Sequence, residues 1–123
     1  MEYIRNVDFA AIDSSGPDER VTQILFDHTS GAKNCSIFCI KTPPGGGSPE
    51  GLHVHDVDQI FYILSGTMSL EIEGKQYDCS PGSLIIFPAG VPHRNWNQGS
   101  EPTVHLAFNT PLPDPSLPFV RPL

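Results

Sequence analysis

The chain has 123 residues, a length that suits one domain with a modest core and is too short for two. It carries 14 acidic and 7 basic residues, for a formal net charge of −7. This balance argues against binding to nucleic acid or to an anionic membrane, because phosphate contacts need clustered Lys and Arg. No apolar run approaches a transmembrane span, and the first residues lack a basic-then-apolar signal pattern. A cytoplasmic protein is therefore expected.

Short apolar and β-branched segments, separated by Gly and Pro, follow one another along the chain. The 13 prolines and 11 glycines leave little room for helices. Strands are predicted at Val21–Asp27, Cys35–Lys41, Asp58–Leu64, Thr67–Ile72, Ser83–Phe87 and Thr103–Phe108. Hairpin turns are predicted at Ser65-Gly66 and Glu73-Gly74. Short strands at such regular spacing favour an all-β sandwich or jelly roll.

The same pattern sets the expected domain organisation. One domain covers residues 1–123, with its core at about 20–109 and a flexible loop at Pro43–Pro49. The tail at 110–123 is rich in proline and cannot pair as a central strand, so it is expected to run extended over the surface or across a partner subunit. Cys35, Cys39 and Cys79 form no CxxC motif and are expected to be reduced, buried thiols.

The stretch from His53 to Gln59 contains three candidate metal ligands. Residues two apart on a strand point to the same face, so His53 and His55 reach the same side. Gln59 shares their parity and joins them if the chain continues or turns through the intervening residues. Two imidazoles and an amide at one point are typical of a metal site, since neutral imidazole suits Zn, Fe, Ni and Cu. His93 offers a further ligand downstream.

These segments resemble the two motifs of the cupin superfamily, and in particular its small single-domain members. The first motif matches at Gly47, His53, His55, Gln59 and Gly66. The second matches at Gly82, Pro88, Gly90, His93 and Asn97. Every spacing agrees, and the one departure is Gln59, which stands where the family usually has glutamate. The resemblance implies an antiparallel jelly-roll β-barrel, commonly a homodimer, that holds one divalent metal through His53, His55, Gln59 and His93.

The neutral Gln59 has a physical consequence if it binds the metal. The ion keeps its full double charge, so it is a stronger Lewis acid and is held less tightly. The alternative is that Gln59 faces the pocket without binding. Three His plus Gln resembles the site of some small bacterial cupins, including metal-dependent hydroxynitrile lyases and enzymes that process unsaturated uronates, whereas many other small cupins are iron dioxygenases.

Strand parity also suggests which side chains surround the metal. By parity, candidate pocket residues are Phe61, Asn95 and Asn109. The face of Ile40 and Thr42 resembles the pocket-lining side in related cupins, which adds these two residues to the candidates. His105 shares the face of Asn109 and is a candidate general acid or base, or else a hydrogen-bonded structural histidine. Pro88 and Gly90 are expected to shape the turn that directs His93 inward.

The leading function is a metalloenzyme with one divalent Mn, Fe, Zn or Ni ion that performs Lewis-acid chemistry, of lyase or isomerase type, on a small oxygenated organic molecule. An iron-dependent dioxygenase is the first alternative. A non-catalytic cupin that binds or senses a small ligand is the second. The fold hosts many unrelated functions, so the motifs alone do not choose among these.

Overall fold

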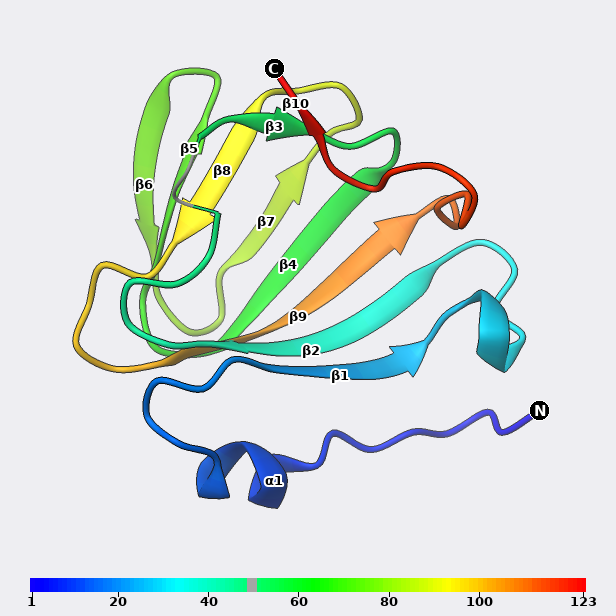
Figure 1. Ribbon diagram of the computed structural model, residues 1–123, viewed down its shortest axis with the longest axis horizontal. Coiled ribbons are helices and arrows are strands. Elements are labelled where there is room, and N and C mark those ends of the chain that lie inside the picture. Colours follow the sequence, from blue (N-terminus) through cyan, green and yellow to red (C-terminus); the bar gives the residue numbers. More distant parts are fainter. Residues whose placement is uncertain (49–50) are drawn as a thin grey trace.

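The computed structural model describes residues 1–48 and 51–123, and its regular secondary structure is almost entirely strand (Figure 1). The predicted loop at Pro43–Pro49 therefore lies partly outside the described residues. Two antiparallel five-stranded sheets face each other. This arrangement confirms the predicted all-β jelly-roll fold.

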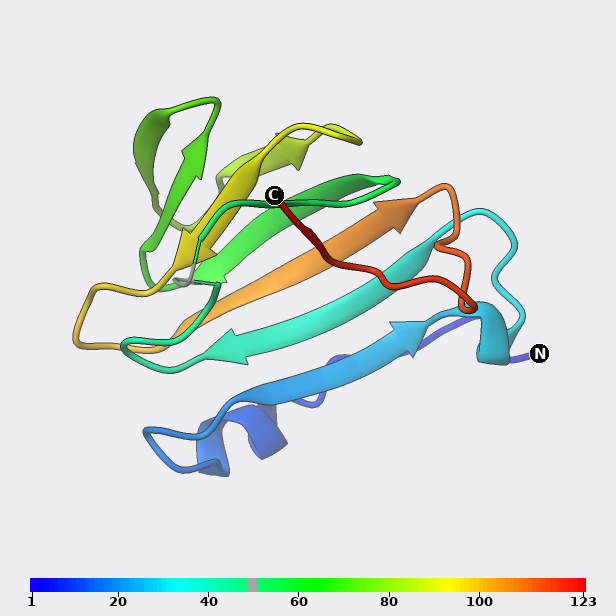
Figure 2. The same cartoon turned by 45° about the horizontal axis from the view of Figure 1, so that its top comes forward.

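The first sheet has the strand order β1-β2-β9-β4-β7. Its strands are β1 (Val21–Phe26), β2 (Ser36–Thr42), β9 (Thr103–Thr110), β4 (Asp58–Ser65) and β7 (Leu84–Phe87). The second sheet has the order β10-β3-β8-β5-β6. Its strands are β10 (Arg121–Pro122), β3 (His53–Val54), β8 (His93–Trp96), β5 (Met68–Ile72) and β6 (Lys75–Cys79). Figure 2 shows how the two sheets splay apart on the side that the C-terminal segment crosses.

The main core lies between the sheets. Its buried residues are Phe61, Ile63, Met68, Leu70, Ile85, Phe87 and Ala107. Alternation along β9 explains this arrangement, since its odd-numbered residues from Thr103 to Asn109 are all buried. Val104 and Leu106 point to the opposite face, where they join a second cluster around Ile12.

That second cluster exists because of an element which the composition did not suggest. Helix α1 (Phe9–Ser14) lays Ile12 on the outer face of the first sheet. Its first turn is capped by Asp8, whose side chain accepts a hydrogen bond from the backbone N–H of Ala11 at 3.0 Å. A short 3-10 helix, η1 (His28–Ser30), connects β1 to β2.

Each predicted strand is present, with ends that differ by one or two residues. The two predicted turns have different outcomes. Glu73 and Gly74 join β5 to β6 in a tight hairpin, with φ of 51° and 81°. The hairpin expected at Ser65-Gly66 is wrong, because β4 and β5 belong to different sheets and Gly66 turns the chain from one sheet to the other.

The tail follows the surface of its own chain. After Thr110 it crosses the open side of the sheets, and β10 pairs antiparallel with β3 at the edge of the second sheet (Figure 1). An ion pair between Arg121 and Asp56 at 2.6 Å holds it there.

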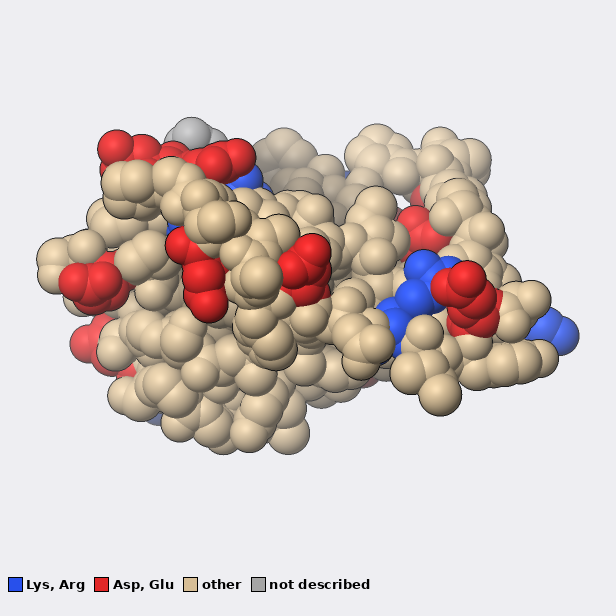
Figure 3. Space-filling model, turned by 90° about the horizontal axis from the view of Figure 1, so that it is seen from below, with Lys and Arg blue, Asp and Glu red and all other residues tan. Residues whose placement is uncertain are grey.

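The three cysteines are free thiols, but only Cys39 is buried as expected, while Cys35 and Cys79 are half-buried. Burial raises the pKa of Cys39 and of Cys79 above the usual thiol value, which keeps both thiols protonated and unreactive. On the face in Figure 3 acidic side chains are more widespread than basic ones, as the net charge of −7 requires. Among the described residues no helix is long and apolar enough to cross a membrane.

Candidate metal centre and pocket

Three histidines from two separate segments meet between the sheets. His53 opens β3 and pairs directly across the sheet with His93, which opens β8. His55 follows β3 by one residue. The ring centroids of the three lie 4.5 to 5.0 Å apart. One ring nitrogen from each histidine lies within 4.8 Å of those of the other two, a spacing at which the three could hold a metal ion.

The orientation of each ring is set by the backbone. The Nδ1 of His55 lies 2.9 Å from the carbonyl of Phe119, and that of His93 lies 3.0 Å from the carbonyl of Val91. The Nδ1 of His53 makes a longer contact, 3.5 Å, with the carbonyl of Gly51. A carbonyl only accepts, so Nδ1 carries the proton and the lone pair of Nε2 is left for a ligand. His93 Nε2 is buried and has no hydrogen-bond partner in the described chain.

The turn before β8 brings together the two segments that carry the three histidines. Gly90 adopts φ of 77°, and its N–H donates to the carbonyl of His55 at 2.9 Å. The N–H of Val91 donates to the carbonyl of Pro88 at 3.1 Å. The chain thus reverses immediately before His93, which places this ring against the other two.

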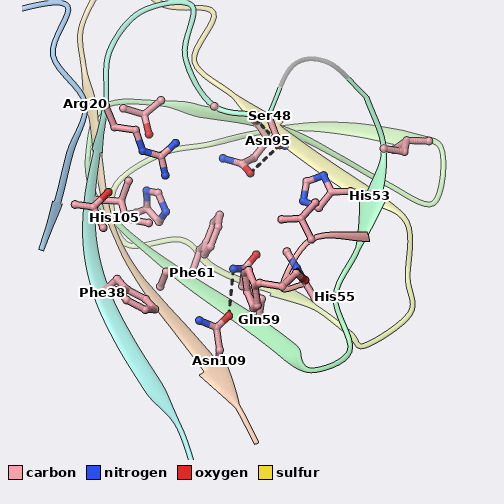
Figure 4. A pocket seen from close by; sticks show the side chains of 18 of the residues that line it. Arg20, Phe38, Ser48, His53, His55, Gln59, Phe61, Asn95, His105 and Asn109 are labelled. Carbon is pink, nitrogen blue, oxygen red and sulfur yellow. Dashed lines mark hydrogen bonds between the residues drawn. The ribbon is translucent and has the colours of Figure 1, made fainter. Parts of the chain in front are cut away.

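Gln59 is held by a line of amide and hydroxyl groups. Its Nε2 donates to Oδ1 of Asn109 at 3.2 Å, and Nδ2 of Asn109 donates to Oγ of Ser36 at 3.0 Å. Because the amide nitrogen is engaged in this way, the Gln59 oxygen is the end left for a ligand. Gln59 lies next to His55 in Figure 4, at the edge of the imidazole cluster.

Burial favours the neutral form of His93 and of His55. It lowers the pKa of His93 to about 4, and the neighbouring His53 and His55 add to that shift. Burial likewise lowers the pKa of His55, and the hydrogen bond with the Phe119 carbonyl offsets the shift only in part. Neutral imidazole is the form that binds metal, so these histidines are ready to act as ligands at neutral pH. Three imidazole nitrogens and an amide oxygen suit a divalent transition metal.

The cluster forms one wall of a cavity of about 500 Å³ (Figure 4). The five predicted pocket residues all line it: Ile40, Thr42, Phe61, Asn95 and Asn109. His53, His55 and Gln59 line it as well, while His93 lies behind them with its ring stacked on Phe87 at 4.2 Å. Asn95 is fixed by Ser48, whose hydroxyl accepts from its backbone N–H at 3.0 Å.

His105 lies at another wall of the same cavity, beside Phe61, with ring centroids 4.2 Å apart. It is 2% exposed, and neither ring nitrogen has a hydrogen-bond partner within the described residues. Burial lowers the pKa of His105 to about 3, and the nearby Arg20 contributes to the shift. The imidazole is therefore neutral at physiological pH.

Several residues of the pocket were not identified from the sequence, and two of them, Arg20 and Phe119, contact or face its histidines. Arg20 immediately precedes β1 and points toward His105 in Figure 4. Its parity matches that of Thr22, which also lines the pocket, but this signal has meaning only once β1 is known to pair with β2. Phe119 stacks on His55, with ring centroids 4.1 Å apart. It lies in the proline-rich tail, where no periodic pattern marks which residues turn inward.

Comparisons with known proteins agree with this geometry. The sequence model of the cupin domain matches residues 38–109, more than half of the chain, and the chain belongs to this family. Germin-like protein 5-1 of Oryza sativa subsp. japonica is 32% identical over 84 residues, which are 63% of this chain and 38% of that protein. The chain thus spans well under half the length of this curated relative.

Two solved structures have the same fold. The polyketide cyclase RemF from Streptomyces resistomycificus superposes with a TM-score of 0.71 at 24% identity, over 85% of this chain and 71% of that one. KdgF from Halomonas sp. gives a TM-score of 0.66 at 22% identity, over 80% and 85% of the two chains. At these identities the likeness establishes the fold alone.

Proposed function

We propose that this cupin is a metal-dependent enzyme that acts on a small oxygenated organic molecule by lyase or isomerase chemistry. The observation that carries the proposal is the convergence of three imidazoles in one wall of the cavity, each with Nδ1 turned to a backbone carbonyl and Nε2 left free. His53, His55, His93 and the oxygen of Gln59 would hold the ion. A bound divalent cation supplies Lewis-acid polarisation of an oxygen group of the substrate.

The four ligands are all neutral, which favours this chemistry. A carboxylate would offset part of the charge of the ion, whereas the Gln59 amide leaves it intact. The hydrogen bond to Asn109 fixes the amide so that its oxygen, and not its nitrogen, is available. The ligand set is therefore suited to withdrawing electron density from a substrate oxygen.

The remaining pocket residues bind and orient the substrate. Phe61 and Ile40 provide an apolar surface that packs against the carbon chain of the substrate. We propose that a proton leaves a substrate C–H bond next to the polarised oxygen group and passes to a water molecule beside the histidine cluster. The electron pair of that bond stays on the substrate, and water returns a proton later in the reaction. His105 orients the substrate in this scheme, because its pKa of about 3 is too low for a base near pH 7.

Metal content and proton exchange test the proposal. Wild-type protein loaded separately with Mn, Fe, Zn and Ni should retain about one ion per chain after gel filtration, measured by elemental analysis, and His93→Ala should lose it. His28→Ala is the matched control, because His28 lies in η1, away from the cluster. Loaded wild type in D2O should exchange protons next to the carbonyl of small oxo acids, followed by proton NMR. Wild-type protein that retains none of the four metals after gel filtration would refute the proposal.

The same experiment separates the alternatives. Oxygen uptake by the iron-loaded protein with an enol or diketone substrate would indicate the dioxygenase. Tight binding of an oxo acid with neither exchange nor oxygen uptake, in fully loaded protein, would indicate a binding or sensing cupin.

A further inference from the structure

The corner of the pocket formed by Arg20 and His105 carries a positive charge (Figure 4). Among the described residues that line the cavity none is acidic, and Arg20 is the one with a fixed charge. The ion pairs found within residues 1–48 and 51–123 join Arg5 to Glu2, Arg94 to Glu71 and Arg121 to Asp56. Arg20 takes part in none of them, so its guanidinium can receive an anion.

His105 is the second polar group in this corner. Its side chain is only 2% exposed, yet neither ring nitrogen has a hydrogen-bond partner in the described chain. The residues directly opposite it on the neighbouring strands, Ile40 and Ile63, are apolar and offer none. A buried polar group without a partner typically costs about 1–3 kcal/mol. A ligand in the cavity that accepts a hydrogen bond removes this cost.

We propose that Arg20 and His105 bind a carboxylate, and that the substrate of this cupin is a small oxo or hydroxy acid. This inference rests on the proposed function, because the oxygen group of the acid is placed at the histidine cluster. The planar guanidinium of Arg20 matches the two oxygens of a carboxylate, and the neutral imidazole of His105 donates one N–H to it.

The charges present favour a carboxylate over a phosphate. A phosphate group carries close to two negative charges at neutral pH, and this corner offers one fixed positive charge. The lysine of the neighbouring strand adds no positive charge to this corner. Lys41 points to the other face of the sheet, where its Nζ donates to Ser15 and, at 2.8 Å, to the carbonyl of Gly16.

The positions along β9 indicate the size of the acid. His105 lies beside Arg20, and Asn109, four residues further along the strand, holds Gln59 at the metal ligands. Four residues of a strand span about 13 Å between Cα atoms, and side chains that lean into the cavity shorten the gap between polar groups. Several carbon atoms therefore separate the carboxylate from the oxygen group, with Phe61 and Ile40 packed against them.

A neutral analogue isolates the contribution of the carboxylate. The probes are 6-oxoheptanoate and its methyl ester, which differ in charge but share the oxo group and the carbon chain. Binding of each is measured by titration calorimetry to metal-loaded protein and to chelator-treated protein. The variants are Arg20→Gln and His105→Phe. Arg5→Gln is the matched control, since it makes the same charge change at an arginine that pairs with Glu2 outside the pocket.

Wild-type protein should bind the acid at least tenfold more tightly than the ester. Arg20→Gln should abolish this preference and leave ester binding unchanged, His105→Phe should reduce it several-fold, and Arg5→Gln should preserve it. Equal affinity for acid and ester, binding of neither, or equal losses in Arg20→Gln and Arg5→Gln would overturn the proposal.

The two proposals fail in different ways. If chelator-treated protein prefers the acid through Arg20 but loaded protein shows no proton exchange, the carboxylate subsite stands and the proposed chemistry does not. If loaded protein exchanges protons on the ester as fast as on the acid and shows no preference, the subsite alone is refuted.

Discussion

Phe119 contacts His55 in two ways, through its ring and through its backbone. The two rings stack with centroids 4.1 Å apart and an interplanar angle of 21°, while the Phe119 carbonyl accepts the Nδ1–H of His55 at 2.9 Å. The tail thereby sets both the tilt and the tautomer of a proposed metal ligand. A hydrogen bond of this kind commonly affects metal affinity by about 10–100-fold.

Removal of residues 119–123 should therefore weaken metal binding by about tenfold or more, since it deletes this carbonyl together with β10. Affinity is measured by competition with a coloured chelator. Phe119→Leu keeps the carbonyl and removes the stacked ring, so it should lose much less. Unchanged affinity in the shortened chain would show that the tail does not orient His55.

Gln59→Glu should raise metal affinity and lower the rate of proton exchange. The carboxylate adds a negative charge to the ligand set, which attracts the ion and reduces its power to polarise the substrate. Competition with a chelator gives the first quantity and NMR in D2O the second. Identical affinity in the variant would mean that Gln59 lines the pocket without binding metal, the alternative left open by the sequence.

Asn109→Leu provides a related test of Gln59. It removes the acceptor for the Gln59 amide nitrogen and leaves the Gln59 side chain unchanged. The amide is then free to rotate, so metal affinity should fall, by about 10–100-fold if Asn109 orients the ligand as such partners do elsewhere. Asn95→Leu also removes an amide from the pocket, but one that bonds Ser48, and it should leave metal affinity nearly unchanged.

His105 should make the protein less stable as the pH falls. Its pKa is about 3 in the folded chain and about 6.5 in the unfolded chain, so between these values the unfolded state binds a proton that the folded state does not. This contribution is fully present above about pH 6.5 and declines by up to about 1.4 kcal/mol per pH unit down to about pH 3.

Urea unfolding of chelator-treated wild type and His105→Phe at several pH values checks this slope. His55 and His93 act in the same direction in both proteins, so the difference between the two curves isolates His105. The variant should gain stability relative to wild type as the pH falls. Parallel curves would contradict the buried, neutral state of His105.

Two glycines with nearly the same backbone conformation offer a test of close packing. Gly66 and Gly74 have φ of 76° and 81°, but a Cβ on Gly66 would lie 2.5 Å from the carbonyl oxygen of Pro102, and one on Gly74 would meet nothing within 4 Å. In both alanine variants the left-handed backbone lowers the free energy of unfolding by about 1–2 kcal/mol. Gly66→Ala should lose a further 1–3 kcal/mol, roughly the range for overpacking, in thermal or urea unfolding.

The strands and the convergence of the three histidines could be predicted because each rests on local pattern. Alternation with period two marks β2, β4 and β9, and the fixed offsets around His53, His55 and His93 persist whatever the loops do. Helix α1 was missed because one turn and a half with a single buried residue, Ile12, gives no helical periodicity. The Ser65-Gly66 turn was misread because a sequence of two strands and a glycine does not show whether the strands pair or separate.

The residues that line the pocket were also predictable only where a local pattern marks them. Phe61 shares a strand face with Gln59, and Asn95 shares one with His93, so parity sufficed to select these two. Ile40 and Thr42 were selected from the resemblance to related cupins. Arg20 and Phe119 enter the cavity through register and through the path of the tail, which are tertiary properties. A single sequence does not encode these in any short window.

The hydrogen bonds from Gln59 through Asn109 to Ser36 run perpendicular to β4, β9 and β2. They form only when all three strands are in their native alignment, because a slip of one residue turns each of these side chains to the opposite face. Uptake of a metal ion during refolding would thus report when β4, β9 and β2 reach their native register. A spectroscopically visible ion such as Co²⁺ would make this step of folding observable.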